Sequence, residues 1–189
     1  DTDKSSLINF TQAWQEQNSV FKSLVFTLGG ELVRNNIETR HLGQNCETHY
    51  YGLYMVDGKQ HIDNHTLVDH AEPNCYSNEL YKGGLTDHST AVFNGKVMVR
   101  QDAQKTNAFQ SNKTVLLSDD ATINTKPQLE IFADDVKCSH GATTGRLDQQ
   151  ALFYLRSRGL DLTSARALLT YAFAAEVVEN VTLEPLAEQ

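Results

Sequence analysis

Proline, cysteine and concentrated positive charge are all scarce in this chain. Only three prolines occur among its 189 residues, so few positions prevent a strand from pairing on both sides. The three cysteines are Cys46, Cys75 and Cys138, a set too sparse for a disulfide framework and better suited to a reducing compartment. The net charge is −8 and the basic residues are scattered. This pattern argues against nucleic-acid binding, because phosphate recognition needs a concentrated basic surface.

A membrane span and an export signal are also missing from the visible pattern. The longest apolar run, residues 165–178, is interrupted by Arg166, Thr170 and Glu176, so no membrane association is expected. No amino-terminal signal peptide is visible, and we expect a cytoplasmic protein. Four N-x-S/T sequons point the other way, although such tripeptides arise by chance in a chain rich in Asn and Thr; they begin at Asn9, Asn64, Asn112 and Asn180. Because the chain starts at Asp1 without a Met, we interpret it as a fragment or a processed product.

Most of the chain is typical of a β-rich body. From about residue 20 to 140, short β-prone segments are separated by turn signals such as Asp57-Gly58 and Asn94-Gly95. Residues 129–134 alternate between apolar and polar side chains, as a half-buried strand does. No strict tandem repeat is present, so these residues alone leave a sandwich, a barrel and a parallel β-helix open.

A helical tail follows the β-rich body. Residues 148–157 have the composition of a helix, and Gly159 is placed to end it. A second helix is predicted from Asp161 or Thr163, as the amino-terminal cap, to about Asn180. A third is predicted near Pro185. We therefore divide the chain into a β core, 1–145, and a carboxyl-terminal helical segment, 146–189.

The second predicted helix is apolar on nearly all sides. One apolar stripe consists of Leu168, Leu169, Ala172, Phe173 and Val177. Tyr171 and Val178 lie largely off that stripe, and few polar residues remain for solvent. Such a helix must be buried on more than one side. We expect it to dock on the β body, on a partner or on both, and packing within the chain is the favoured interpretation.

Most candidate chemical sites in the sequence have a structural explanation. His61, His65 and His70 resemble a metal site only loosely, because His65 and His70 have opposite parity in an extended strand. Cys46 and Cys75 have no nearby thiol and are interpreted as small buried residues. The sequence contains no Gly-x-Ser-x-Gly elbow, no phosphate-binding loop and no dinucleotide fingerprint. We therefore expect a protein that is not an enzyme.

The segment Cys138-Ser139-His140 is the remaining candidate site. Strand parity places Cys138 and His140 on one face. A thiolate and an imidazole on one face could bind iron or another soft or borderline metal. Two ligands cannot complete a tetrahedral site, so further ligands would come from another chain or from sulfide. Spacing alone favours the alternative, in which a buried Cys lies beside a structural His.

Ordered blocks along the chain resemble a known family. The sequence is similar to the SufB/SufD family of iron–sulfur cluster assembly scaffold proteins, and in particular to SufD-like members. The blocks that carry the resemblance include Asn45-Cys46-Glu47-Thr48-His49, Asp57-Gly58-Lys59-Gln60-His61, Asn78-Glu79-Leu80-Tyr81-Lys82-Gly83, Lys126-Pro127-Gln128-Leu129-Glu130-Ile131, Cys138-Ser139-His140-Gly141-Ala142-Thr143 and Leu152-Phe153-Tyr154-Leu155-Arg156-Ser157-Arg158-Gly159.

The resemblance implies a fold and a set of partners. The implied fold is mainly β: a right-handed parallel β-helix core with a short carboxyl-terminal α-helical domain. The implied partners are a SufB-like paralogue, which meets this chain near the carboxyl ends of the two β-helices, and a SufC-like ABC ATPase, which docks on the carboxyl-terminal helices. A homodimer is the alternative when the paralogue is absent.

The resemblance also implies roles for particular residues. His140 corresponds to the family's functional histidine at the subunit interface, and Cys138 is its neighbour. Together they would contact an iron–sulfur cluster that is held transiently and shared with the paralogue, with His140 as the metal ligand. The ATPase would be contacted by Leu168, Tyr171, Phe173 and Val178.

Two other hypotheses remain open at this point. A secreted, carbohydrate-active parallel β-helix protein would explain the strands and the sequons. A purely structural subunit that positions the ATPase would need the helices but not His140.

The SufB-like version of the motif usually reads Glu-His-Glu-Ala, whereas Ser139 and Gly141 flank the histidine here. This chain is therefore expected to supply a complementary ligand rather than the principal set.

Overall fold

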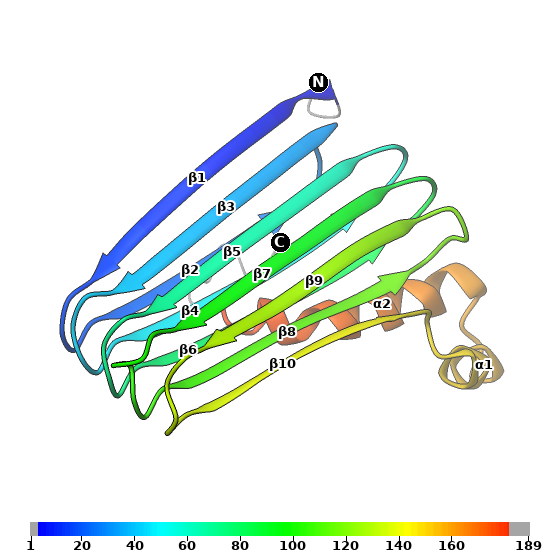
Figure 1. Ribbon diagram of the computed structural model, residues 1–189. Coiled ribbons are helices and arrows are strands. Elements are labelled where there is room, and N and C mark those ends of the chain that lie inside the picture. Colours follow the sequence, from blue (N-terminus) through cyan, green and yellow to red (C-terminus); the bar gives the residue numbers. More distant parts are fainter. Residues whose placement is uncertain (1–3, 182–189) are drawn as a thin grey trace.

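Ten parallel strands wind into a solenoid of two facing sheets in the computed structural model, which describes residues 4–181 (Figure 1). Sheet A has the order β1-β3-β5-β7-β9 and contains β1 (Ser6–Gln15), β3 (Leu32–His41), β5 (His61–His70), β7 (Thr90–Val99) and β9 (Thr122–Ile131). Sheet B has the order β10-β8-β6-β4-β2 and contains β2 (Val20–Thr27), β4 (Glu47–Val56), β6 (Tyr76–Leu85), β8 (Asn107–Leu116) and β10 (Lys137–Gly145). Successive strands alternate between the two sheets, which confirms the expected β-helix architecture.

The length of one turn varies along the solenoid. Leu32 pairs with His61, and His61 pairs with Thr90, so two successive turns advance by 29 residues. Thr90 pairs with Thr122, an advance of 32, whereas Ser6 pairs with Leu32, an advance of 26. The strands themselves stay close to ten residues long, so the extra residues lie in the corners. This variation explains why no repeat of fixed length is visible in the sequence.

The core lies between the two sheets and follows from period-2 alternation. In β3 and β7, every second side chain is buried. The main apolar cluster fills the middle turns and includes the fully buried rings of Tyr50, Tyr54, Tyr81 and Phe93. Polar side chains inside the solenoid bond to one another across strands; for example, Asn35 Nδ2 donates to Asn64 Oδ1 at 3.1 Å.

The helical tail begins after the last strand. Helix α1 spans Gln149–Ser157, and Asp148 caps it by accepting hydrogen bonds from the backbone N–H groups of Gln150 and Ala151. Helix α2 spans Leu162–Val178, with Asp161 as its cap. Figure 1 shows α2 lying against the outer face of sheet B. The helix predicted near Pro185 lies outside the described residues.

The structure corrects two details of the sequence-based expectation. A strand, β1, precedes residue 20, where the β-rich region was expected to begin. Its side chains Ile8, Phe10 and Trp14 are exposed, so its apolar residues do not mark a core face. The buried face of α2 is also rotated from the predicted stripe: Ala174 is buried, whereas Leu168 is 45% exposed.

Candidate functional site

The last strand, β10, forms one end of sheet B within the described part of the chain. It pairs in parallel with β8, placing Cys138 opposite Ala108 and His140 opposite Gln110. Ala108 and Gln110 are buried inward-facing residues of β8. Both residues of the motif therefore lie on the inner face of sheet B, as strand parity predicts. His140 is nevertheless exposed, because no described strand follows β10 to cover this position.

Cys138 is more enclosed than His140. It is half-buried and packs against the small apolar cluster that contains Val97, Ala108 and Ala133. Burial raises the pKa of the Cys138 thiol. The thiol therefore stays mainly protonated at neutral pH, and it would have to lose its proton before it could bind a metal. His140 is the more available ligand of the two.

The chemistry of this site is that of an incomplete ligand set. Among the described residues, no group of three or more His, Cys, Asp or Glu side chains is arranged to hold a metal ion. Cys138 and His140 offer one sulfur and one imidazole nitrogen, both of which suit iron. Such a pair can contribute to an iron–sulfur cluster only if other ligands come from outside this part of the chain.

The three histidines of β5 do not form a common site. His61 and His65 are half-buried on the outer face of sheet A, whereas His70 is fully buried inside the solenoid. His61 Nδ1 lies 2.6 Å from Thr90 Oγ1, and His65 Nε2 lies 2.8 Å from Asp63 Oδ1. This separation agrees with their parity in the sequence and supports their structural interpretation.

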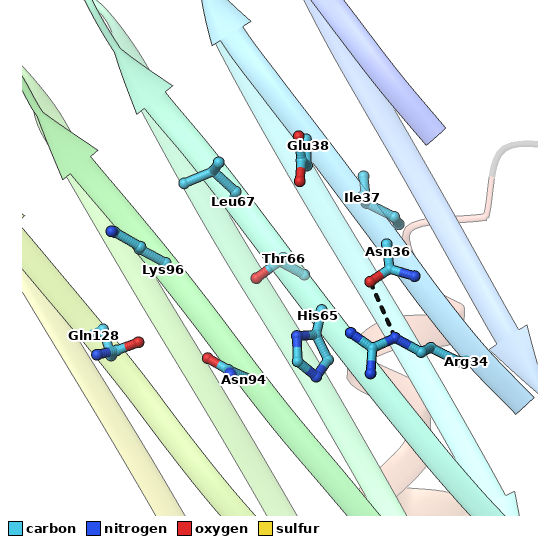
Figure 2. Close-up of a pocket in the computed structure, with 10 residues that line it drawn as sticks. All are labelled: Arg34, Asn36, Ile37, Glu38, His65, Thr66, Leu67, Asn94, Lys96 and Gln128. Carbon is cyan, nitrogen blue, oxygen red and sulfur yellow. Dashed lines mark hydrogen bonds between the residues drawn. The ribbon is translucent and has the colours of Figure 1, made fainter. Parts of the chain in front are cut away.

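A shallow hollow of about 330 Å³ lies on the outer face of sheet A (Figure 2). Figure 2 shows that its lining comes from neighbouring strands and that His65 lies beside Arg34 and Asn36. Arg34 Nε donates to Asn36 Oδ1 at 3.2 Å. The lining contains one acidic side chain, Glu38, and no Phe, Tyr or Trp. The hollow therefore lacks the acidic or aromatic lining that the carbohydrate-binding hypothesis predicts.

Two of the four sequons are buried inside the solenoid. Asn64 is 2% exposed and Asn112 is 1% exposed. Asn112 Oδ1 accepts a hydrogen bond from the Tyr54 hydroxyl at 3.1 Å. Neither side chain can carry a glycan in this fold, which supports the interpretation of these tripeptides as chance occurrences.

Two buried histidines form part of the core. His41 and His70 lie on adjacent strands of sheet A, with ring centroids 4.5 Å apart. His41 Nε2 lies 2.8 Å from Thr48 Oγ1, and His70 Nε2 lies 2.8 Å from Ser77 Oγ. Burial lowers the pKa of His41 to about 4 and that of His70 well below its ordinary value. Both rings are therefore neutral at pH 7.

The four helix residues proposed for partner binding divide into two pairs. Leu168 and Tyr171 are exposed, Tyr171 by 69%. Phe173 and Val178 instead face the body: Phe173 lies under the Lys82 ammonium, and Val178 packs with the apolar cluster between α2 and sheet B.

Sequence reasoning missed three buried residues of β6 and β8. Lys82 is 5% exposed, and its Nζ donates to the Phe173 carbonyl oxygen at 2.6 Å and lies 2.6 Å from Glu176 Oε2. Glu79 and Gln110 lie inside the solenoid in the same in-register row as His140. For Glu79 and Gln110, a polar residue at an inward position would have been the only signal in the sequence. Lys82 lies on the outer face of β6, and its burial comes from α2.

Comparison with known proteins identifies the family. Residues 1–173 match the family described as "SUF system FeS cluster assembly, SufBD core domain". The chain belongs to this family. It is 43% identical over 164 residues to the iron–sulfur cluster assembly protein SufD of Escherichia coli, covering 87% of this chain and 39% of that protein. The SufBD core assignment agrees with the resemblance carried by the sequence blocks.

Two further relatives cover nearly the whole chain. An iron–sulfur cluster assembly SufBD family protein of Synechocystis is 40% identical over 186 residues, which is 98% of this chain and 41% of that protein. The Arabidopsis thaliana protein ABCI7, named as chloroplastic, is 38% identical over 98% of this chain and 39% of its own length. The chain thus spans about two fifths of the length of these relatives. Among the described residues, no helix is long and apolar enough to cross a membrane.

Proposed function

We propose that this SufBD core is part of a non-catalytic scaffold subunit, located in the cytoplasm, on which an iron–sulfur cluster is assembled. The family match supports a role in cluster assembly. The observation that carries the finer proposal is the position of His140, which is exposed on the inner face of the end strand β10. The cluster is cargo of the scaffold, and His140 would supply one iron ligand, with Cys138 as a second candidate.

The end strand also supports pairing with a SufB-like paralogue. Within the described residues, β10 pairs with β8 on one side only. An edge strand presents backbone donors and acceptors that another chain can use to extend the sheet. A paralogue bound at this edge would bring its own ligands close to His140. The incomplete ligand set would then be completed across the interface.

The test of this proposal replaces His140 in the full-length protein, produced together with its presumed partners and purified without oxygen. The His140→Ala variant should assemble normally but yield much less iron and sulfide per complex. His65→Ala, on the outer face of sheet A, is the matched control and should leave the yield unchanged. A normal iron and sulfide content in His140→Ala would overturn the proposal.

The exposed face of α2 supports docking of a SufC-like ABC ATPase. Leu168 and Tyr171 leave an apolar surface on the helix, while its opposite face is held against sheet B. Leu168→Glu combined with Tyr171→Glu should abolish co-purification of the ATPase without unfolding the chain, because both side chains are exposed. Ile8→Glu, at an exposed position on β1, is the control. Undiminished ATPase binding by the double variant would exclude this face.

A further inference from the structure

Three hydrogen-bonded polar side chains cross the interior of the solenoid. The last of them lies on β8, the strand that pairs with β10, which carries His140. The Thr66 hydroxyl on β5 donates to Glu79 Oε2 on β6 at 2.6 Å. Gln110 Nε2 on β8 donates to the same carboxylate oxygen at 3.3 Å. Glu79 is 1% exposed and Gln110 is 3% exposed. The carboxyl group of Glu79 is thus the buried anchor that orients the Gln110 side chain.

Gln110 has one hydrogen-bonding group that the described residues leave unused. Its carbonyl oxygen, Oε1, is buried and accepts no hydrogen bond from them. An unpaired buried acceptor costs about 1–3 kcal/mol, so its retention requires a physical reason. The amide nitrogen is committed to Glu79, and in a planar carboxamide the oxygen diverges from the nitrogen. The oxygen is therefore free to accept a hydrogen bond from another group.

That strand is β10, and its in-register residue is His140. Glu79 pairs with Gln110 in the β6–β8 register, and Gln110 pairs with His140 in the β8–β10 register. The structure shows no hydrogen bond between the two side chains, and His140 is exposed. Neighbouring strands lie about 4.8 Å apart, so a turn of the His140 side chain towards β8 would bring a ring nitrogen to the Gln110 amide. In-register side chains on one face of a sheet are the natural hydrogen-bonding partners.

The facing sheet makes room for this arrangement. Gly95 on β7 pairs with Thr66 in sheet A. A Cβ atom at Gly95 would collide with Gln110 Nε2 and lie 2.9 Å from its Cδ. The absence of a side chain at Gly95 therefore leaves the space that the Gln110 amide fills. The orientation of the amide is fixed by packing as well as by its hydrogen bond.

Burial raises the pKa of Glu79 to about 7. Near neutral pH a large fraction of this carboxyl group is uncharged, which reduces the cost of keeping it in the core. The anchor can accept the Gln110 hydrogen bond in either protonation state. The orientation of Gln110 is thus preserved across the physiological pH range.

We propose that Gln110 is a positioning residue that accepts a hydrogen bond from one ring nitrogen of His140 and thereby fixes its tautomer. The other ring nitrogen is then left unprotonated and free to bind iron. Histidines that bind metals usually donate their second ring N–H to such an acceptor, and loss of the acceptor commonly lowers metal affinity about 10–100-fold. This inference rests on the proposed function of His140 and adds the residues that prepare it.

The decisive measurement is the tautomer of His140 in the metal-free full-length protein. With ¹⁵N-labelled histidine, long-range ¹H–¹⁵N spectra distinguish protonated from unprotonated ring nitrogens, and His140→Ala assigns the signal. When the His140 ring is neutral, the parent protein should show one nitrogen of each kind. In Gln110→Leu the two nitrogen shifts should move towards each other as the tautomers exchange.

Three variants separate positioning from a general structural effect. Gln128→Leu, on the outer face of sheet A, should leave the His140 signals unchanged. Gln110→Asn shortens the side chain and should lose the single tautomer even if Gln110→Leu folds poorly. Glu79→Gln keeps an acceptor oxygen for the Gln110 amide and should therefore retain the single tautomer of His140. Unchanged His140 shifts in Gln110→Asn or Gln110→Leu would overturn the proposal.

Cluster yield provides the second readout and separates the two proposals. In the assembled complex, supplied with Fe²⁺ and sulfide, Gln110→Leu should reduce the rate of cluster formation about tenfold or more. If His140→Ala has normal cluster yield, the proposed function fails even where the tautomer result holds. If His140→Ala loses the cluster while Gln110→Leu is normal in both readouts, only the positioning role fails.

Discussion

Inward-facing side chains are buried in the middle turns of the solenoid but mostly exposed on its last strand, β10. In the middle turns, inward side chains are sealed between the two sheets, and His70 is fully buried. On β10, the same parity leaves His140 exposed. The strand geometry is common to both regions, so the difference comes from what covers each position. The buried His41 and His70 are neutral packing elements, whereas the imidazole of His140 is open to solvent, as its proposed role as a ligand requires.

The largest contrast should come from adding one methyl group in each region. A Cβ at Gly52 would collide with the buried ring of Tyr81, whereas nothing lies within 4 Å of a Cβ at Gly141. Gly52→Ala should therefore lower the free energy of unfolding by about 3 kcal/mol, and Gly141→Ala should raise it by about 0.5 kcal/mol. Urea denaturation followed by circular dichroism measures both. Equal effects would show that β10 is packed like the middle turns.

The pH dependence of stability should reveal the buried carboxyl group of Glu79. Its pKa is raised from 4.5 to about 7 in the folded state, so folding favours the protonated form. Its contribution is fully present below pH 4.5 and is lost as the pH rises through 7. Glu79→Gln should therefore stabilise the protein by up to about 3 kcal/mol at pH 8 and have little effect at pH 4.

Two histidines complicate the raw pH profile of stability but not this difference. Folding depresses the pKa of His41 to about 4 and lowers that of His70. Their contributions are present above about pH 6.5 and are lost as the pH falls through the folded pKa values. Subtracting the profile of the parent protein from that of Glu79→Gln cancels the two histidines. A difference that does not grow between pH 4.5 and pH 8 would contradict the assignment to Glu79.

Removing the imidazole in each region gives a smaller contrast. His70→Ala deletes a fully buried ring and leaves the hydroxyl of Ser77 without its partner, so a loss of about 2 kcal/mol is expected. His140→Ala removes an exposed side chain and should change stability by less than about 0.5 kcal/mol. Thermal unfolding by calorimetry compares the two. A large loss in His140→Ala would mean that cluster defects in that variant reflect unfolding.

The smallest contrast concerns the cysteines. Cys75 is 1% exposed, and its pKa is raised by burial to about 11, whereas Cys138 is only half-buried. Cys75→Ala should cost about 1 kcal/mol because the lost sulfur resembles one buried methylene, and Cys138→Ala about half of that. In the native protein, a thiol-alkylating reagent should modify Cys138 first. Simultaneous labelling of both thiols would show that the middle turns open as readily as the end.

Local features of this fold could be predicted from sequence where they depend on neighbouring residues. Asp161 was predicted as a possible helix cap because its side chain can accept a hydrogen bond from the first turn of the helix that follows, and the structure confirms it. The shared face of Cys138 and His140 followed from strand parity alone. These inferences need only the period of a strand or the first turn of a helix.

Features that depend on distant covering elements could not be predicted in the same way. Strand β6 departs from alternating burial because α2 covers its outer face, so all of residues 79–85 are buried. Because both faces of β6 are buried here, its sequence does not alternate between apolar and polar residues, and nothing in it indicates that Glu79 faces inward. Strand β1 was missed for the opposite reason: its apolar residues are exposed, so their pattern indicates no core. The row that joins Glu79 to His140 depends on corners of different lengths, which no local pattern encodes.

Strand β6 is a mechanical link between the outside and the inside of the molecule. Lys82 on its outer face is tied to α2 through the Phe173 carbonyl oxygen and the Glu176 carboxylate. Three residues earlier, Glu79 on its inner face holds the amide of Gln110. A force that pulls α2 away from sheet B therefore acts on the same short stretch of backbone that orients the row ending at His140. Displacement of α2 and the orientation of the Gln110 amide are therefore coupled through residues 79–82 of β6.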